Sequence, residues 1–182
     1  DDWWGEGPKL DQLIFRSIPD NSARLAEFIS GGVHQADLAQ TDHAAAEADP
    51  NIVSYDSPSM GIGYVAFQQC TPPFDKLEVR QAIAHALNRQ ALIDAFYTER
   101  DVLAKGFQPP AIMGHNPDLP AIEYNPDKAK ELLAAAGLAD GFKTEFWYIP
   151  VIRGYFPDSK AIAEAMAVDL AKVGIEVELK TE

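Results

Sequence analysis

The spacing of apolar residues along the chain changes between a strand-like period of two and a helical period of 3.6. In the first third of the chain, the strand-like segments are 10–18, 33–38 and 52–55. Asp20 or Asn21 supplies the N-cap of a helix that is predicted to end near Ser30, because such side chains accept hydrogen bonds from first-turn amides. A short, alanine-rich helix is predicted over 41–48.

The helical pattern is stronger in the rest of the chain. Helices are predicted after Asp75, after Asn88, over 126–136 and over 160–173, and strands are predicted at 62–67, 144–149 and 175–179. Asn125-Pro126 marks a helix start, because asparagine caps the helix and proline is tolerated at its first position. Repeated prolines and glycines in 101–125 predict a long ordered loop. Strands that alternate with helices indicate an α/β lobe with a mixed sheet.

Composition limits the class of protein. The 182 residues carry a formal net charge of −13, which argues against binding to nucleic acid, and their 47% hydrophobic content is ordinary for a folded domain. No segment approaches the roughly 20 apolar residues of a membrane-spanning helix. The single cysteine, Cys70, has no partner for an intrachain disulfide, and we expect it to be a small, partly buried side chain.

No pattern typical of an enzyme or a metal site is present in the sequence. The histidines lack the close spacing of metal ligands and stand at His34, His43, His85 and His115. Gly61 and Gly63 lack the third glycine and the following helix that a dinucleotide-binding loop requires. We therefore predict a protein that is not an enzyme and uses no cofactor.

One segment has the composition of a binding loop. Residues 146–157 place Arg153 among aromatic residues, including Trp147 and Tyr155, directly after a predicted strand. Loops at strand ends often carry binding groups, and an arginine holds a carboxylate through two parallel hydrogen bonds. Aromatic walls would exclude water and strengthen that pair. Composition alone favours the alternative, a buried aromatic strand followed by a surface arginine.

Several motifs together resemble one family. They are Trp4-Gly5-Glu6-Gly7-Pro8-x-Leu10-Asp11, Ile18-Pro19-Asp20-Asn21-Ser22-Ala23-Arg24, Pro73-Phe74-Asp75-x3-Val79-Arg80-Gln81-Ala82-Ile83, Asn116-Pro117-Asp118-Leu119-Pro120 and Tyr124-Asn125-Pro126-Asp127-Lys128-Ala129-Lys130. In this order, from end to end of the chain, they resemble the family 5 solute-binding proteins, the group that binds dipeptides, oligopeptides and nickel. The loop 150–157 looks most like the dipeptide-binding branch of that family.

The resemblance implies a type II periplasmic-binding-protein-like fold, in which two lobes close over a ligand and the full-length protein carries an extra domain. Residues 1–57 would belong to the first lobe and 58–182 to an incomplete second, C-terminal lobe. The crossover would lie near the linker candidate Ser57-Pro58-Ser59. We therefore expect an internal fragment of a longer protein, and an isolated chain that binds peptide weakly and tends to dimerise.

The resemblance also implies roles for individual residues. Arg153 matches the arginine that pairs with the C-terminal carboxylate of the peptide in dipeptide-binding relatives, and Tyr155 matches an aromatic residue beside it. Trp147 is the third ligand-binding candidate. Gly154 stands where relatives carry proline, which leaves this loop less rigid. The family's acidic partner for the peptide amine has no match within this chain.

The function that the resemblance implies is capture of dipeptides or short peptides in the periplasm, for delivery to the permease subunits of an ABC transporter. Contact with the membrane would come only through the transporter or a lipid anchor. Two alternatives stay open: the same scaffold with haem, glutathione or a metal chelate as its ligand, and a structural or signalling module without a ligand.

Overall fold

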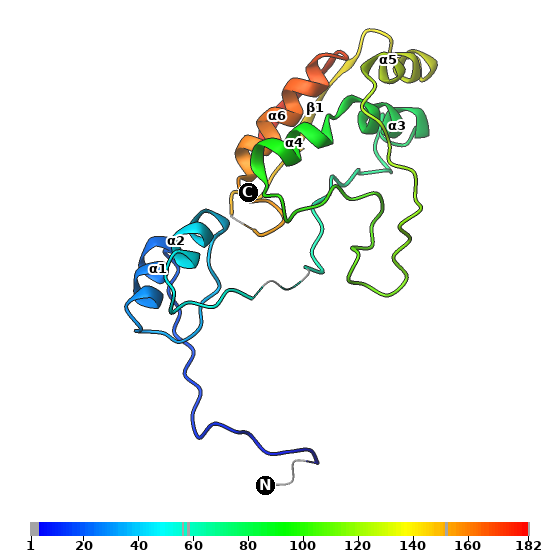
Figure 1. The fold of residues 1–182 in the computed structure, drawn as a ribbon. Helices are drawn as coiled ribbons and strands as arrows, with labels where there is room; N and C mark the ends of the chain where they lie inside the picture. Colours follow the sequence, from blue (N-terminus) through cyan, green and yellow to red (C-terminus); the bar gives the residue numbers. More distant parts are fainter. Residues whose placement is uncertain (1–3, 56, 58, 152, 182) are drawn as a thin grey trace. The chain divides into compact units, whose positions relative to one another are not determined.

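The computed structural model describes residues 4–55, 57, 59–151 and 153–181 (Figure 1). The chain divides into two compact units, Asp1–Asp56 and Ser57–Glu182. This boundary adjoins the linker candidate at residues 57–59, of which Pro58 lies outside the described residues. The assignment of the two units to two lobes of a larger protein stays a prediction.

The first unit contains two short helices joined by loops. Helix α1 spans Asn21–Ile29, and the carboxylate of Asp20 caps it by accepting a hydrogen bond from the amide of Ala23 at 2.7 Å. A 3-10 turn, η1 (Gln40–Asp42), leads into α2 (His43–Glu47). Both helices predicted for this part of the chain are therefore confirmed.

The three strands predicted for this unit do not form within its described residues. Residues 10–18, 33–38 and 52–55 are irregular backbone. Leu13 and Phe15, whose side chains would share one face of a strand over 10–18, are both exposed. A strand forms only when a neighbouring segment pairs with its backbone amides and carbonyls, and no described segment does so here. The alternation of side chains thus predicted strands for segments that lack a pairing partner.

Polar contacts, rather than an apolar core, hold the first unit together. Among its described residues only Ala46 is buried. Arg24 of α1 donates three hydrogen bonds of 2.6 to 2.8 Å, to the carbonyls of Ile18 and Asp37 and to Oδ1 of Asn21. One guanidinium therefore ties both flanking loops to the helix, which uses the fixed fork of donors that arginine offers.

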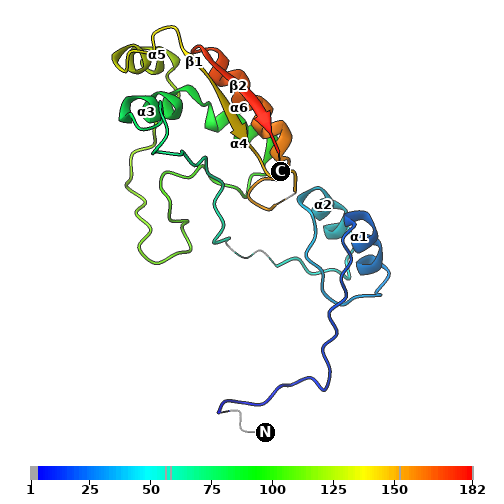
Figure 2. The same ribbon diagram turned by 180° about the vertical axis from the view of Figure 1, so that it is seen from behind.

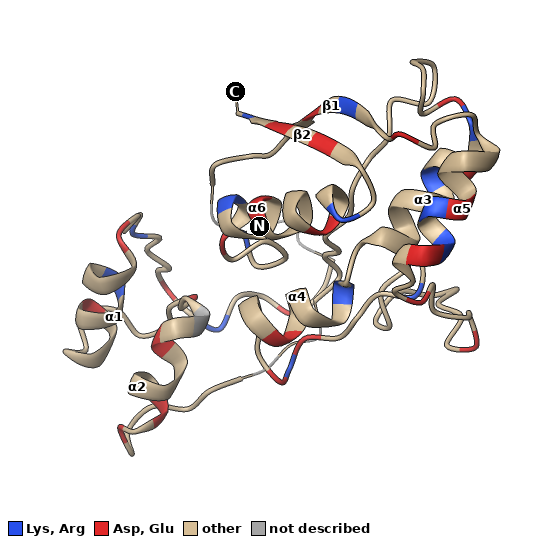
Figure 3. Ribbon diagram, turned by 90° about the horizontal axis from the view of Figure 1, so that it is seen from above, with Lys and Arg blue, Asp and Glu red and all other residues tan. Residues whose placement is uncertain are grey.

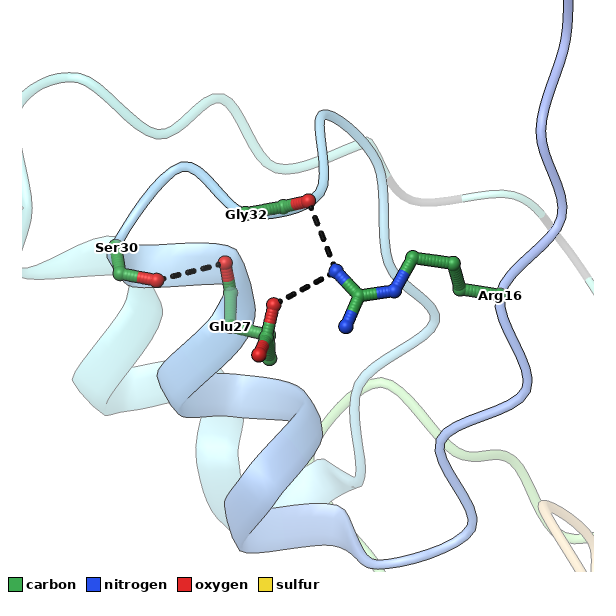
Figure 4. A network of polar contacts seen from close by, with 4 residues as sticks. All are labelled: Arg16, Glu27, Ser30 and Gly32. Atoms are coloured by element: carbon green, nitrogen blue, oxygen red, sulfur yellow. Dashed lines mark hydrogen bonds and ion pairs between the residues drawn. The ribbon is translucent and has the colours of Figure 1, made fainter.

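A second arginine closes the turn after α1. Arg16 Nη1 donates to the carboxylate of Glu27 at 2.8 Å and to the carbonyl of Gly32 at 3.2 Å, and Ser30 Oγ donates to the Glu27 carbonyl at 3.1 Å (Figure 4). The Arg16 and Glu27 side chains are about half exposed. Solvent therefore screens the ion pair, and we expect it to contribute at most about 1 kcal/mol.

The second unit contains the apolar core. Its helices are α3 (Leu77–Ala86), α4 (Arg89–Phe96), α5 (Pro126–Ala135) and α6 (Ser159–Ala171), and its strands are β1 (Phe142–Trp147) and β2 (Ile175–Lys180). Helix α3 packs along α5, and α6 packs against β2 and contacts α3 and α4. Figure 2 shows the two strands side by side with α6 lying along them.

β1 and β2 pair in parallel, with Phe142 opposite Ile175 and Phe146 opposite Leu179. Helix α6 connects them, so the segment is a βαβ unit, the building block of α/β folds. Its apolar face meets the core, where Leu133, Ile175 and Val79 are the largest fully buried side chains. The expected α/β fold class is confirmed, and the described part of the sheet has two parallel strands.

Three expectations for the second unit are wrong. Residues 62–67 form no strand, although the side chains of Val65 and Phe67 pack against the core. The N-cap of α3 is Lys76 and not Asp75, whose carbonyl instead accepts a hydrogen bond from Arg80 at 3.0 Å. Cys70 is exposed in the turn that follows residue 67, rather than partly buried.

Charged residues of both signs share the helices of the second unit. Figure 3 shows Lys and Arg interspersed with Asp and Glu along α3 and α5. Across the outward face of the sheet, Lys143 of β1 pairs with Glu176 of β2 at 2.6 Å. Because the two signs are mixed, these elements offer no basic surface for a polyanion.

A buried aspartate links α6 to the start of α4. Asp169 Oδ2 accepts a hydrogen bond from the amide of Asn88 at 2.9 Å, and its Oδ1 accepts one from Lys172 at 2.7 Å. Asp169 is the one buried charged residue among those described. Asn88 is the N-cap residue of α4, so this hydrogen bond ties the start of α4 to α6.

We expect Asp169→Ala to lower the free energy of unfolding by about 2 kcal/mol, because it leaves a part-buried amide without its acceptor. Lys172→Ala is the matched control: Lys172 is half exposed, and its removal takes away the outer contact of the same carboxylate and a contact with Tyr124 but leaves the Asn88 contact in place. Denaturant unfolding of both variants tests the prediction. Equal losses in the two variants would show that the Asn88 contact contributes nothing of its own.

Candidate functional site

The loop that carries Arg153 is fixed at both ends. At its start, the amide of Tyr148 donates to the carbonyl of Lys180 at 3.0 Å, which continues the pairing of β1 with β2. At its end, Asp158 caps α6 by accepting a hydrogen bond from the amide of Ala161 at 3.0 Å. Ser159 Oγ donates to the carbonyl of Ile149 at 2.5 Å and so joins the two ends. Within this loop, position 152 lies outside the described residues.

Residues 153–156 form a tight reversal, which we call the arginine turn. The amide of Arg153 donates to the carbonyl of Phe156 at 3.1 Å, and the amide of Phe156 donates back to the carbonyl of Arg153 at 2.9 Å. The rings of Tyr155 and Phe156 meet edge to face with centroids 5.7 Å apart. A Cβ at Gly154 would meet no atom within 4 Å, so this corner of the turn faces open space.

The side chain of Arg153 is exposed at this turn and forms no hydrogen bond or ion pair with any described residue. Tyr155, two residues along, is 42% exposed. A guanidinium presents five donors in a planar fork, and here that fork is unused by the described part of the chain. The turn therefore offers a cation and an aromatic surface to an anionic ligand.

Trp147 lies apart from the arginine turn. It ends β1 on the face that also carries Lys143 and Glu145, opposite the face on which Phe142 and Phe146 are partly buried against the core. Its Nε1 donates to the carboxylate of Glu145 at 3.0 Å. Among the described residues, no hydrogen bond or ring contact joins Trp147 to Arg153. The structure thus brings Tyr155, but not Trp147, into one turn with the arginine, and the ligand-binding role of all three stays a prediction.

Sequence reasoning missed the contact that reaches this turn from α4. Tyr97, the residue after α4, donates its hydroxyl hydrogen to the carbonyl of Tyr155 at 2.9 Å. Burial and the neighbouring Asp101 carboxylate raise the pKa of Tyr97 to about 12. A contact between residues 97 and 155 leaves no periodic signal in the sequence. The only local indication was an aromatic residue with a polar group directly after a helix.

This raised pKa has a consequence for stability at high pH. Tyrosine in an unfolded chain ionises near pH 10, whereas Tyr97 in the folded protein holds its proton to about pH 12. Between these values the unfolded state loses the proton first, so the free energy of unfolding should fall as pH rises, with no such effect below pH 10. Ultraviolet titration of tyrosinate should show a late step that is missing in Tyr97→Phe. An unchanged titration curve in that variant would contradict this.

The described residues offer neither a metal site nor a membrane-spanning helix. Within the described ranges, no group of three or more His, Cys, Asp and Glu side chains is placed to hold a metal ion. No helix in the part of the chain that the structure describes is both long and apolar enough to cross a membrane.

Comparison with known proteins gives the family. The sequence profile of the bacterial extracellular solute-binding proteins, family 5 Middle, matches residues 1–182. The chain belongs to this family. Membership confirms the family that the five sequence motifs predicted, and it agrees with the α/β architecture of the second unit.

Curated relatives of the chain are named for different ligands. The chain is 36% identical over 182 residues to the dipeptide-binding protein of Escherichia coli K12, and 36% identical over 180 residues to heme-binding protein A of Haemophilus influenzae. These matches cover 100% and 96% of the chain but only 34% and 32% of the two relatives. The chain therefore spans about a third of the length of the curated relatives it matches.

A solved structure has a similar fold. The dipeptide-binding protein from Pseudoalteromonas sp. SM9913, in complex with Met-Leu, superimposes with a TM-score of 0.76 at 30% identity. The match covers 91% of this chain and 33% of that protein. The arrangement of helices and strands described above is thus found within a larger peptide-binding protein.

Proposed function

We propose that these residues form part of a binding protein that captures dipeptides or other short peptides for an ABC importer. The observation that carries this proposal is the exposed guanidinium of Arg153, which has no partner among the described residues and lies in a turn with Tyr155. A carboxylate, such as the free C-terminus of a peptide, fits such a fork through two charge-assisted hydrogen bonds.

Similarity to peptide-binding relatives supports the same ligand. The relative from E. coli is named for dipeptides, and the solved structure with a TM-score of 0.76 holds the dipeptide Met-Leu. In this proposal Arg153 binds the C-terminal carboxylate, and Tyr155 covers the pair and excludes water. Trp147, on the outer face of β1, would contribute only if the ligand or the loop extends to that face.

Haem is the second candidate ligand. A relative named for haem is as similar to this chain, at 36% identity, as the dipeptide-binding relative. A haem propionate is also a carboxylate, so Arg153 alone does not separate the two ligands. Glutathione, itself a peptide with free carboxylates, is compatible with the same turn.

The proposed cellular setting follows from the family, which is described as extracellular. We propose that the parent protein works in the periplasm and hands its ligand to the permease subunits of the importer. Binding, and not catalysis, is the proposed activity, since the relatives named above are binding proteins. Lipid anchoring, and dimerisation of the 182-residue chain by itself, stay predictions.

Mass spectrometry of ligands carried through native purification of the full-length protein tests this proposal. We expect short peptides with free C-terminal carboxylates. Haem in place of peptides would support the second candidate. An empty protein that also fails to bind added dipeptides or haem would contradict both, and would favour a module that has lost its ligand.

A further inference from the structure

The arginine turn is contacted from two distant segments at a single atom, the carbonyl oxygen of Tyr155. The hydroxyl of Tyr97 donates to this oxygen at 2.9 Å. Gly63 approaches the same oxygen, because a Cβ added at position 63 would lie 2.8 Å from it and 3.1 Å from Cζ of Phe156. That separation is shorter than a carbon and a backbone oxygen tolerate, so only glycine fits position 63 without moving the turn.

Tyr97 is itself held in place. Its amide donates to the carbonyl of Ile93 at 3.0 Å and so completes the last turn of α4. Just after it, the carboxylate of Asp101 accepts hydrogen bonds from the amide of Thr98 at 2.9 Å and from its hydroxyl at 2.8 Å. A tyrosine hydroxyl is protonated at neutral pH, so that of Tyr97 is a hydrogen-bond donor there, and its raised pKa of about 12 extends this state to higher pH.

The turn has few restraints of its own. Its described internal contacts are the two backbone hydrogen bonds between Arg153 and Phe156 and the ring contact of Tyr155 with Phe156. Gly154 adds flexibility, because it lacks a Cβ and faces open space. An unrestrained turn would have to order its backbone when a ligand binds, and this ordering weakens affinity.

We propose that Tyr97 and Gly63 are positioning residues that pre-orient Arg153 for a ligand carboxylate, acting through the carbonyl of Tyr155. This inference rests on the peptide-binding function proposed above. Neither residue touches the ligand. Tyr97 fixes the peptide group of Tyr155 by a hydrogen bond, and Gly63 fixes it by close packing. The backbone from which the guanidinium extends is then ordered before the ligand arrives.

The first test is Tyr97→Phe in the full-length protein, with calorimetry of a dipeptide and of its C-terminally amidated form. Loss of one hydrogen bond should weaken binding of the free-carboxylate peptide roughly fivefold. The amidated peptide lacks the group that Arg153 would bind, so its affinity should change little. Tyr124→Phe is the matched control, because Tyr124 interacts with Lys172 instead of the turn. We expect it to bind both peptides as the unaltered protein does.

The second test is Gly63→Ala, whose control is Gly7→Ala at a position where an added Cβ meets no atom within 4 Å. We expect the same selective loss as in Tyr97→Phe, and a double variant whose loss is smaller than the sum, because both residues act on one oxygen. Equal weakening of both peptides, or no weakening, would overturn the positioning role while the proposed function stands. Failure of the unaltered protein to bind either peptide would overturn both.

Discussion

Replacing Met166 by aspartate should destabilise the second unit by at least about 3 kcal/mol, because the variant places a carboxylate without a partner in the packed face of α6. Met166 is buried together with Ile162 and Leu170, which lie on the same stripe of the helix and meet the core. Small domains are stable by roughly 5–15 kcal/mol, so a loss of this size removes a large part of the total.

Denaturant unfolding measures this loss, and α6 supplies its own control. Val168 lies on the same helix but is 62% exposed, so Val168→Asp introduces the same charge on the solvent side. We expect its unfolding midpoint to stay close to that of the unaltered protein. An unchanged midpoint in Met166→Asp would show that the stripe does not pack as described.

The helices of this fold could be predicted from the sequence because the residues that start them act locally. Asp20, Asn88 and Asn125 each accept a hydrogen bond from the amide three residues later. Such a cap needs only the residue and the turn that follows it, so the sequence contains all of the required information. The helix expected to be capped by Asp75 begins one residue later, with Lys76 at the N-cap position and no side-chain cap hydrogen bond.

Strands were harder to predict, because a strand depends on a partner that the local pattern does not specify. β1 and β2 were recovered since α6 returns the chain so that they pair in register. The segments 10–18 and 62–67 have a similar alternation or apolar content, yet no described segment pairs with either. The pattern identifies a segment able to pair, and the structure decides whether a partner is present.

The candidate site likewise combines features that a local sequence pattern indicates with a contact that depends on a distant segment. The aromatic residues around Arg153 and the family resemblance pointed to the loop, and the structure places Arg153 and Tyr155 in one turn. The support from Tyr97 joins residues 58 positions apart. Nothing in the local pattern of either segment encodes that contact, so only the packing of the loop beside the end of α4 reveals it.

Arg153→Ala in the full-length protein should weaken dipeptide binding by about 2–4 kcal/mol, because a desolvated carboxylate would lose its charged partner. The exposed guanidinium has no described partner of its own, so its removal should leave the fold intact. Lys160→Ala is a suitable control, since it removes another exposed cation near the start of α6. We expect that control to bind dipeptide normally.

The decisive measurement is a cycle that combines this variant with an amidated dipeptide. Amidation removes the carboxylate charge, and Arg153→Ala removes the cation, so each change should cause a similar loss of affinity in calorimetry. If the two groups bind each other, the second change costs little once the first has been made, because the interaction is already gone. Losses that simply add would show that the carboxylate is bound elsewhere, and that the exposed arginine after β1 is a solvated surface residue.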